Sequence, residues 1–333
     1  MSRILITGAG GAAAVALIER LTAVGHDVFS ADMSPYAAGL FLVVAERRLL
    51  IPPASATDFI GRLVALCKRH AIDLLIPTVD AELVPVALAQ RRFAEVGARV
   101  LVAPVAALRL CLDKLSLVRT VAPIAPVPRT ELLGEGSLDA TWKYPVIVKP
   151  RTGSGGRGVV LVESAEELAR VPRSPDLMVQ EYACGEEYSV DVLATQLGRV
   201  VAAVPRVRLK VDSGVAVAAR SVHAADLEEL AERIASVVGL TGVANIQFRR
   251  DRSGRPLLLE INPRFPGTMP LTVAAGVDMP VYAVRDILGR RCRRSPRFAE
   301  VAMVRTWRET FLPTAELAAL TDIEFDVAAV AAS

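Results

Sequence analysis

The most specific stretch of this sequence is YPVIVKPRTGSGGRGVVLV, residues 144–162, and it indicates two strands joined by a glycine-rich loop. Strand alternation places the two valines of VIVK on one face, and Ile147 and Lys149 on the other. A lysine that ends an apolar run is costly to bury unless it meets an anion. Loop 153–158 is rich in glycine, so its backbone N–H groups can close over phosphate. We therefore predict a phosphate-binding hairpin, the alternative being a plain turn with a solvent-directed lysine.

A second hairpin is indicated by GVANIQFRRDRSGRPLLLEINPRFPGT, residues 242–268. Its RDRSGR segment has the composition of a turn, so the flanking strands should pair. We centre the turn on the bond after Arg252. The expected cross-strand pairs are then Gln247 with Leu258 and Asn245 with Glu260.

This register predicts a polar face made of Asn245, Gln247, Glu260 and Asn262, and an opposite face made of Leu257, Leu259 and Ile261. Carboxylate and amide oxygens that converge on one face suit Mg²⁺. The alternative is a solvated polar face, which explains poorly why Glu260 follows three leucines. Arg264 continues the alternation and could meet the charge of a transferring phosphoryl group.

A third motif is the polar link 181–185 between two predicted strands. Its backbone could hydrogen-bond the edge of an adenine, and Glu187 could accept from ribose hydroxyls. An ordinary β-turn is an equal alternative.

The first hundred residues alternate between apolar strands and amphipathic helices, which is typical of an open parallel α/β sheet. Gly8, Gly10 and Ala13 fit the G-x-G-x-x-G/A turn, and Asp32 ends the next strand, where a ribose-binding acid lies in dinucleotide-binding folds. The glycines alone do not decide between a dinucleotide and another role, because any backbone that approaches an anion favours them.

The expected elements follow from periodicity and turn residues. In the N-terminal part, strands are predicted at 3–7, 27–32, 47–52, 73–78 and 98–104, and helices at 12–25, 56–71, 80–97 and 105–121. After a proline-rich link at 122–130, strands are predicted at 144–150, 158–164, 176–182, 186–195, 198–209, 242–251 and 255–264, with a helix at 226–239. The tail suggests a strand at 298–311 and a helix at 314–322.

Composition indicates a globular chain of two or three domains. The net charge of +3 is too small to indicate nucleic-acid binding. The four cysteines are scattered and the three histidines are few, so disulfide and zinc sites are not indicated. No stretch is long and apolar enough to cross a membrane, and we expect a cytoplasmic protein.

Together, the three motifs resemble the ATP-grasp superfamily, in particular its branch related to the large subunit of carbamoyl phosphate synthase. The resemblance covers residues 105–290, and the N-terminal region resembles the domain that precedes an ATP-grasp domain. It implies a Rossmann-like α/β domain with an open parallel sheet at 1–105. A two-lobed α+β ATP-grasp domain then has lobes at 106–180 and 181–292, with an extension at 293–333.

The resemblance also implies site residues by position. Those of the nucleotide are Lys114, Lys149, the loop residues Gly153, Ser154, Gly155, Gly156 and Gly158, the hinge residues Glu181, Tyr182 and Cys184, and the ribose acid Glu187. Those of Mg²⁺ are Gln247, Glu260 and Asn262, with Arg264 beside them. Gln247 departs from the carboxylate that is more common there, which would hold a second Mg²⁺ less firmly.

The implied cofactors are ATP and Mg²⁺, for which Mn²⁺ could substitute. The implied reaction is ADP-forming ligation: a carboxylate, expected to be that of an amino acid, is activated as an acyl phosphate and joined to an amine. Arg206, Arg208 and Lys210 share one strand face and could clamp the carboxylate, or could form a solvated edge. The glycine turn is then expected to face the central cleft, with Thr78, Asp80 and Glu82 at a neighbouring strand end, although helix capping would also explain both acids.

Other functions stay open. A carbamoyl-phosphate-type subunit would use bicarbonate, ammonia and a glutaminase partner, but only one ATP-grasp unit is present here and no biotin-related segment is apparent. An NAD-dependent oxidoreductase and a nucleotide-binding regulator are further alternatives. The expected partners are small molecules, without nucleic acid or membrane, and the extension from 293 could contact a second copy of the chain.

Overall fold

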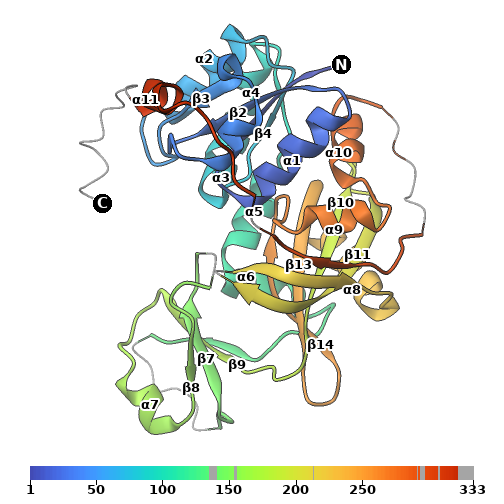
Figure 1. Ribbon diagram of the computed structural model, residues 1–333. Coiled ribbons are helices and arrows are strands. Elements are labelled where there is room, and N and C mark those ends of the chain that lie inside the picture. The colour runs from blue at the N-terminus through green and yellow to red at the C-terminus, as the bar shows by residue number, and fades with distance from the viewer. Residues whose placement is uncertain are drawn as a thin grey trace.

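The computed structural model describes residues 1–134, 141–153, 156–212, 214–290, 292, 297–306 and 308–321. Three sheets follow one another along the chain (Figure 1). The first is parallel, and the second and third are antiparallel. The predicted fold class, an open parallel-sheet domain followed by a two-lobed α+β domain, is confirmed.

The N-terminal sheet has the strand order β3-β2-β1-β4-β5. Its strands are β1 (Arg3–Thr7), β2 (Asp27–Asp32), β3 (Arg48–Leu50), β4 (Leu74–Ile76) and β5 (Arg99–Val100). Its helices are α1 (Ala12–Ala23), α2 (Phe59–Arg69), α3 (Asp80–Leu88) and α4 (Gln90–Ala94), the last two replacing the single helix predicted at 80–97. Ile4 and Ile6 pack with α1, whereas Leu5 packs with α2, as the alternation of β1 requires.

The helix predicted at 105–121 is two helices, α5 (Val105–Leu112) and α6 (Lys114–Val121). Asp113 breaks the helix because its backbone is extended and its carboxylate accepts from the backbone N–H of Ser116 (3.2 Å). It therefore acts as the N-cap of α6.

The small lobe is a four-stranded sheet in the order β6-β9-β7-β8 (Figure 1, lower left). Its elements are β6 (Thr130–Leu132), β7 (Val146–Pro150), β8 (Val160–Val162), α7 (Ala165–Arg170) and β9 (Leu177–Glu181). The proline-rich link thus ends in β6, which pairs with β9. Val146 and Val148 pack on Trp142 and Val179 to form the core of this lobe.

The third sheet has the order β14-β13-β10-β11-β12-β15. Its strands are β10 (Glu187–Ala194), β11 (Val200–Asp212), β12 (Val215–Ser221), β13 (Gly242–Arg250), β14 (Pro256–Asn262) and β15 (Ala302–Val304), with helix α8 (Ala225–Val238) between β12 and β13. The pattern did not indicate β12 or α7, and the strand expected at 298–311 is only the short β15.

In the described part of the chain, three helices follow β14: α9 (Met269–Ala274), α10 (Met279–Ile287) and α11 (Thr314–Thr321), of which only α11 was predicted. In Figure 1, α11 lies beside β3, where Glu316 pairs with Arg48. Within the described residues, no helix has both the length and the apolar character needed to span a membrane.

The N-terminal domain and the six-stranded sheet share a core. One buried cluster contains Phe59 and Leu63 of α2 together with Ile246, Phe248 and other residues of the third sheet. Because these side chains are fully buried, the two parts stabilise each other.

Replacing Phe248 with alanine tests this shared core. The side chain is 0% exposed, so its removal should cost about 3–5 kcal/mol of unfolding free energy. The control Leu197→Ala changes a residue that is 96% exposed and should shift stability by no more than about 0.5 kcal/mol. Guanidinium unfolding followed by circular dichroism measures both, and equal values would contradict the shared core.

Candidate active site

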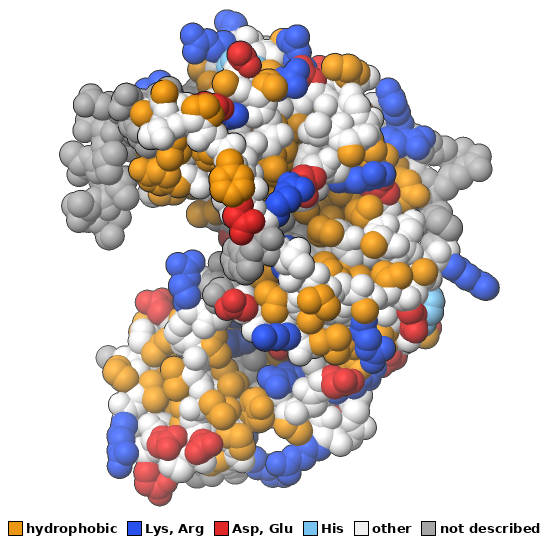
Figure 2. Space-filling model, in the orientation of Figure 1, with side chains coloured by type: hydrophobic (Ala, Val, Ile, Leu, Met, Phe, Trp, Pro, Cys, Tyr) orange, Lys and Arg blue, Asp and Glu red, His pale blue; other side chains and the backbone are white. Residues whose placement is uncertain are grey.

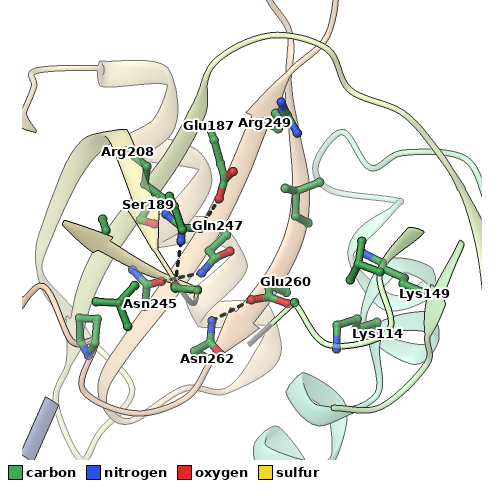
Figure 3. A pocket seen from close by; sticks show the side chains of 18 of the residues that line it. Lys114, Lys149, Glu187, Ser189, Arg208, Asn245, Gln247, Arg249, Glu260 and Asn262 are labelled. Carbon is green, nitrogen blue, oxygen red and sulfur yellow. Dashed lines mark hydrogen bonds and ion pairs between the residues drawn. The ribbon is translucent and has the colours of Figure 1, made fainter. Parts of the chain in front are cut away.

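A cavity of about 570 Å³ lies between the small lobe and the six-stranded sheet. Its walls come from β7 and the loop after it on one side, and from β10, β11, β13 and β14 on the other (Figure 3). The space-filling view shows a hollow between the small lobe and the rest of the molecule (Figure 2). Residues from all three sequence motifs line this cavity.

Lys149 projects into the cavity from β7, together with Ile147, as the alternation predicts. The side chain is only 8% exposed, and burial lowers its pKa to about 8. The charge of Glu260 raises the pKa and that of Lys114 lowers it, both less than burial does. An anion placed in the cavity would therefore stabilise the ammonium strongly.

Residues at the break between α5 and α6 contact the start of the glycine loop. Asp113 accepts from Arg151 Nε (2.8 Å) and Nη2 (2.5 Å), and this guanidinium holds the pKa of the carboxyl well below its usual value. The next residue, Lys114, donates from Nζ to the carbonyl of Gly153 (2.5 Å). Sequence reasoning identified Lys114 but missed Asp113 and Arg151, although Asp is a preferred N-cap residue.

The glycine loop borders the cavity at Gly153 and Gly156. Both have positive φ, 112° and 71°, a conformation that other residues rarely adopt. A side chain at Gly158 would come within 2.9 Å of Pro150. Ser154 and Gly155 lie outside the described residues.

The polar face of the second hairpin is confirmed, but its register is not. Gln247 pairs with Glu260, and Asn245 with Asn262, two residues away from the predicted pairs. The turn is centred on Ser253 rather than on the bond before it, which moves each partner by one residue. A bulge after Gln247 moves the partners beyond it by one residue more. Because the total shift is two residues, Asn245, Gln247, Glu260 and Asn262 still share one face.

The bulge also changes the role of Leu259. This leucine lines the cavity, whereas Leu258 packs into the core. The prediction that Leu259 shares the apolar face with Leu257 and Ile261 is therefore wrong, because the extra residue at the bulge reverses the alternation locally.

The oxygens available here fit a hard divalent cation. Glu260 supplies a carboxylate and accepts from Asn262 Nδ2 (3.1 Å), and Gln247 supplies an amide oxygen beside it. Among the described residues, no three His, Cys, Asp or Glu side chains cluster as ligands. Such a sparse set suits Mg²⁺ when phosphate oxygens complete its shell.

The link after β9 borders the cavity through Glu181, Tyr182 and Ala183. Arg249, which the sequence analysis did not single out, lies over the Tyr182 ring at 5.2 Å and also lines the cavity. Cys184 lies in the same link, where it is exposed and does not line the cavity.

Arg206 and Arg208 both line the cavity from β11. Arg206 is buried against Asp191 (3.0 Å), and burial lowers its pKa. Arg208 pairs with Glu187, which also lines the cavity. Lys210 does not share this face, because bulges on both sides of it turn its side chain to solvent.

Arg264 lines the same cavity just after β14. It donates to both oxygens of Asp80, at 2.6 Å and 3.1 Å. Asp80 is the first residue of α3, and its carboxylate serves this ion pair rather than a helix cap. One residue of the N-terminal domain thus orients an arginine of the cavity.

The other polar residues at the end of β4 are buried and do not face the cavity, contrary to expectation. Glu82 is 6% exposed and accepts from the Thr7 hydroxyl, while Thr78 donates to the Thr7 carbonyl (2.8 Å). Burial raises the pKa of Glu82 to about 7.

The glycine turn after β1 is present, and its surroundings argue against a dinucleotide. Asp32 accepts from the backbone N–H of Gly10 (2.8 Å) and of Ser34 (2.9 Å). A side chain at Gly267 would come within 3.1 Å of Ala12, so the chain itself covers the start of α1. That is the end of the helix that a pyrophosphate would need.

Comparison with protein families agrees with this geometry. The family described as ATP-grasp in the biosynthetic pathway with Ter operon matches residues 173–310, and the PylC-like N-terminal domain matches residues 4–101. The chain carries an ATP-grasp domain behind a PylC-like domain. The predicted superfamily is thereby confirmed.

Curated relatives match parts of this ATP-grasp chain. It is 28% identical over 169 residues to the arginine-specific large chain of carbamoyl phosphate synthase from Bacillus subtilis, and 28% identical over 172 residues to acetyl-CoA carboxylase 2 from Oryza sativa subsp. japonica. The matches cover 44% and 43% of this chain but only 15% and 7% of those proteins.

Solved structures share the fold over most of the chain. N5-carboxyaminoimidazole synthetase from Staphylococcus aureus, complexed with ADP, has a TM-score of 0.73 at 17% identity and covers 90% of this chain and 81% of its own. Biotin carboxylase from Campylobacter jejuni, in a β-γ-ATP complex, has a TM-score of 0.72 at 19% identity, with 87% and 72% covered.

The titration of Lys149 can be measured by NMR, because so small a number of lysine signals can be resolved from one another. The chain has only five lysines: Lys68, Lys114, Lys143, Lys149 and Lys210. We expect its side-chain NMR signal to titrate near pH 8. Glu260→Gln removes the charge that favours the ammonium and should move this pKa further down. Lys149→Arg assigns the signal by deleting it, and an unchanged pKa in Glu260→Gln would show that the two groups do not interact.

Proposed function

We propose that this protein is an ATP-dependent, ADP-forming ligase that activates a small carboxylate as an acyl phosphate and couples it to an amine. The main support for this proposal is a single cavity. Lys149 and the glycine loop line one side of it, and Glu260, Gln247 and Asn262 line the other. Nucleotide phosphates between these walls would meet a buried cation on one side and metal-binding oxygens on the other.

The lining suggests how a nucleotide would be bound. Its phosphates would be held by Lys149 and Lys114, beside Gly153 and Gly156. Its base would pack against the end of β9, at Glu181–Ala183, and Glu187, which lines the same cavity, would accept from the ribose. Mg²⁺ at Glu260 and its neighbours would neutralise charge on the phosphates.

The arginines define where the carboxylate is activated. Arg206, Arg208 and Arg264 line the cavity beside the polar face of β13 and β14. A guanidinium binds a carboxylate with two parallel hydrogen bonds and also stabilises charge on a transferring phosphoryl group. The carboxylate attacks the γ-phosphorus, ADP leaves, and the amine displaces phosphate from the acyl phosphate, forming the C–N bond.

A carbamoyl-phosphate-type reaction, with bicarbonate and ammonia, is the second candidate, favoured by the match to a carbamoyl phosphate synthase large chain. Phosphate release from ATP and Mg²⁺ separates the two. The panel offers amino acids singly and in pairs, with bicarbonate plus ammonia in a further well. Stimulation by one pair supports carboxylate–amine ligation and identifies its substrates. Stimulation by bicarbonate plus ammonia alone supports the second candidate, and no response to any well contradicts both an amino-acid substrate and the second candidate.

Glu260→Ala should abolish ATP turnover while the fold stays intact, because the half-buried carboxylate contributes charge to the cavity rather than to a core. Phosphate release and the melting temperature are measured together. The matched control, Glu229→Ala, removes an exposed carboxylate from α8 and should retain turnover. Turnover near the wild-type rate in Glu260→Ala would contradict the metal site.

The lowered pKa of Lys149 predicts a pH dependence. Below about pH 8 the free enzyme carries the ammonium, and above it the neutral amine predominates. The kcat/KM for ATP should thus fall above that pH, while kcat should hold to higher pH because bound phosphate stabilises the ammonium. Lys149→Arg keeps its charge and should remove this decline. A decline that persists in the variant would assign it to another group.

A further inference from the structure

A carboxylate beneath the floor of the cavity belongs to none of the sequence motifs. Asp191 lies in the middle of β10 and is 0% exposed. Its Oδ1 accepts from Asn245 Nδ2 (2.7 Å) and pairs with Arg206 Nη2 (3.0 Å), and its Oδ2 accepts from the Thr272 hydroxyl (2.5 Å). Three donors from β13, β11 and α9 therefore converge on one buried group.

This arrangement fixes the direction of an amide. An ionised carboxylate only accepts hydrogen bonds, so Asn245 must turn its NH₂ group toward Asp191. The carbonyl oxygen of Asn245 then faces the other way, where Gln247 donates to it from Nε2 (3.3 Å). The NH₂ group of Gln247 is thereby engaged, and its carbonyl oxygen is left for the cavity.

The second amide lies at the metal-binding face. Gln247 stands directly opposite Glu260 in the hairpin, and both line the cavity. In Figure 3 the dashed line joins the nitrogen of Gln247 to Asn245, while its oxygen points away from Asn245. An amide in the opposite orientation would present N–H groups, which repel a cation.

We infer that Asp191 is a positioning residue that sets the direction of the Asn245–Gln247 relay and so presents the Gln247 oxygen to the divalent cation. The inference rests on the proposed function, since it concerns the cation of that site. A glutamate at position 247 would need no such relay, because both of its oxygens are ligands. Glutamine at this position makes the buried carboxylate necessary.

The test measures cation binding without turnover. Mn²⁺ is titrated into the full chain with ADP, and free Mn²⁺ is followed by its electron paramagnetic resonance signal. In Asp191→Asn the group at position 191 can donate as well as accept, so the relay loses its direction. Loss of an outer-shell partner typically weakens metal binding at least about 10-fold, and we expect that increase in the Mn²⁺ Kd.

The decisive variant is Gln247→Glu in the Asp191→Asn background. A carboxylate at position 247 needs no orientation, so Mn²⁺ affinity should return to within about 3-fold of the affinity of Gln247→Glu alone. A general structural role of Asp191 would not be rescued in this way. Failure of the rescue in a folded double variant overturns the inference.

A second route keeps the test independent of the buried ion pair. Asn245→Leu breaks the relay but leaves Asp191 paired with Arg206, and it should weaken Mn²⁺ binding with the same rescue by Gln247→Glu. Thr272→Val removes a donor from Asp191 outside the relay and should change the Kd less than about 3-fold. An effect of Thr272→Val as large as that of Asp191→Asn would overturn the inference.

The outcomes separate the inference from the proposed function. Mn²⁺ binding by the wild-type chain with ADP, combined with an unchanged Kd in Asp191→Asn and Asn245→Leu, overturns the relay but retains the nucleotide site. Absence of any ADP-dependent Mn²⁺ binding by the wild-type chain would instead contradict the proposed site itself.

Discussion

A buried ammonium that faces a carboxylate across a cavity is the constraint on which this structure depends. Lys149 lies on β7 and Glu260 on β14, so the two charges belong to different sheets. Burial disfavours the lysine charge, and the carboxylate recovers only part of that cost. The lobes therefore enclose a space that favours a multiply charged anion with its counter-ion. The surrounding arginines differ, since each already has a carboxylate: Arg206 with Asp191, Arg208 with Glu187, and Arg264 with Asp80.

Much of this site could be predicted because strand alternation is a local rule. The face of β7 that carries Lys149 and the polar face of the β13–β14 hairpin both follow from period two. The register of that hairpin did not follow, because the position of the turn and the bulge each shift the paired residues by one. The two errors together preserve the face, but Leu259, at the bulge itself, was misplaced.

What the sequence could not supply were partners far apart in the chain. Nothing near Arg264 points to Asp80, and nothing near Asn245 points to Asp191 or Thr272, because these contacts exist only once three sheets are assembled. The break at Asp113 is different. Its capping pattern is local, but an apolar periodicity that continues through it favoured one long helix over two.

The ion pair between Arg264 and Asp80 limits how the chain can be truncated, because it joins the third sheet to the N-terminal domain. The apolar cluster around it joins Ile4 and Ile6 of the first sheet to Val243, Phe265 and Met269. A fragment that begins after residue 105 would expose this apolar surface to water and leave the Arg264 guanidinium without its bidentate acceptor. The cavity therefore depends on more of the chain than the two lobes that line it, and exchanging the first domain between relatives would change the position of Arg264 as well as stability.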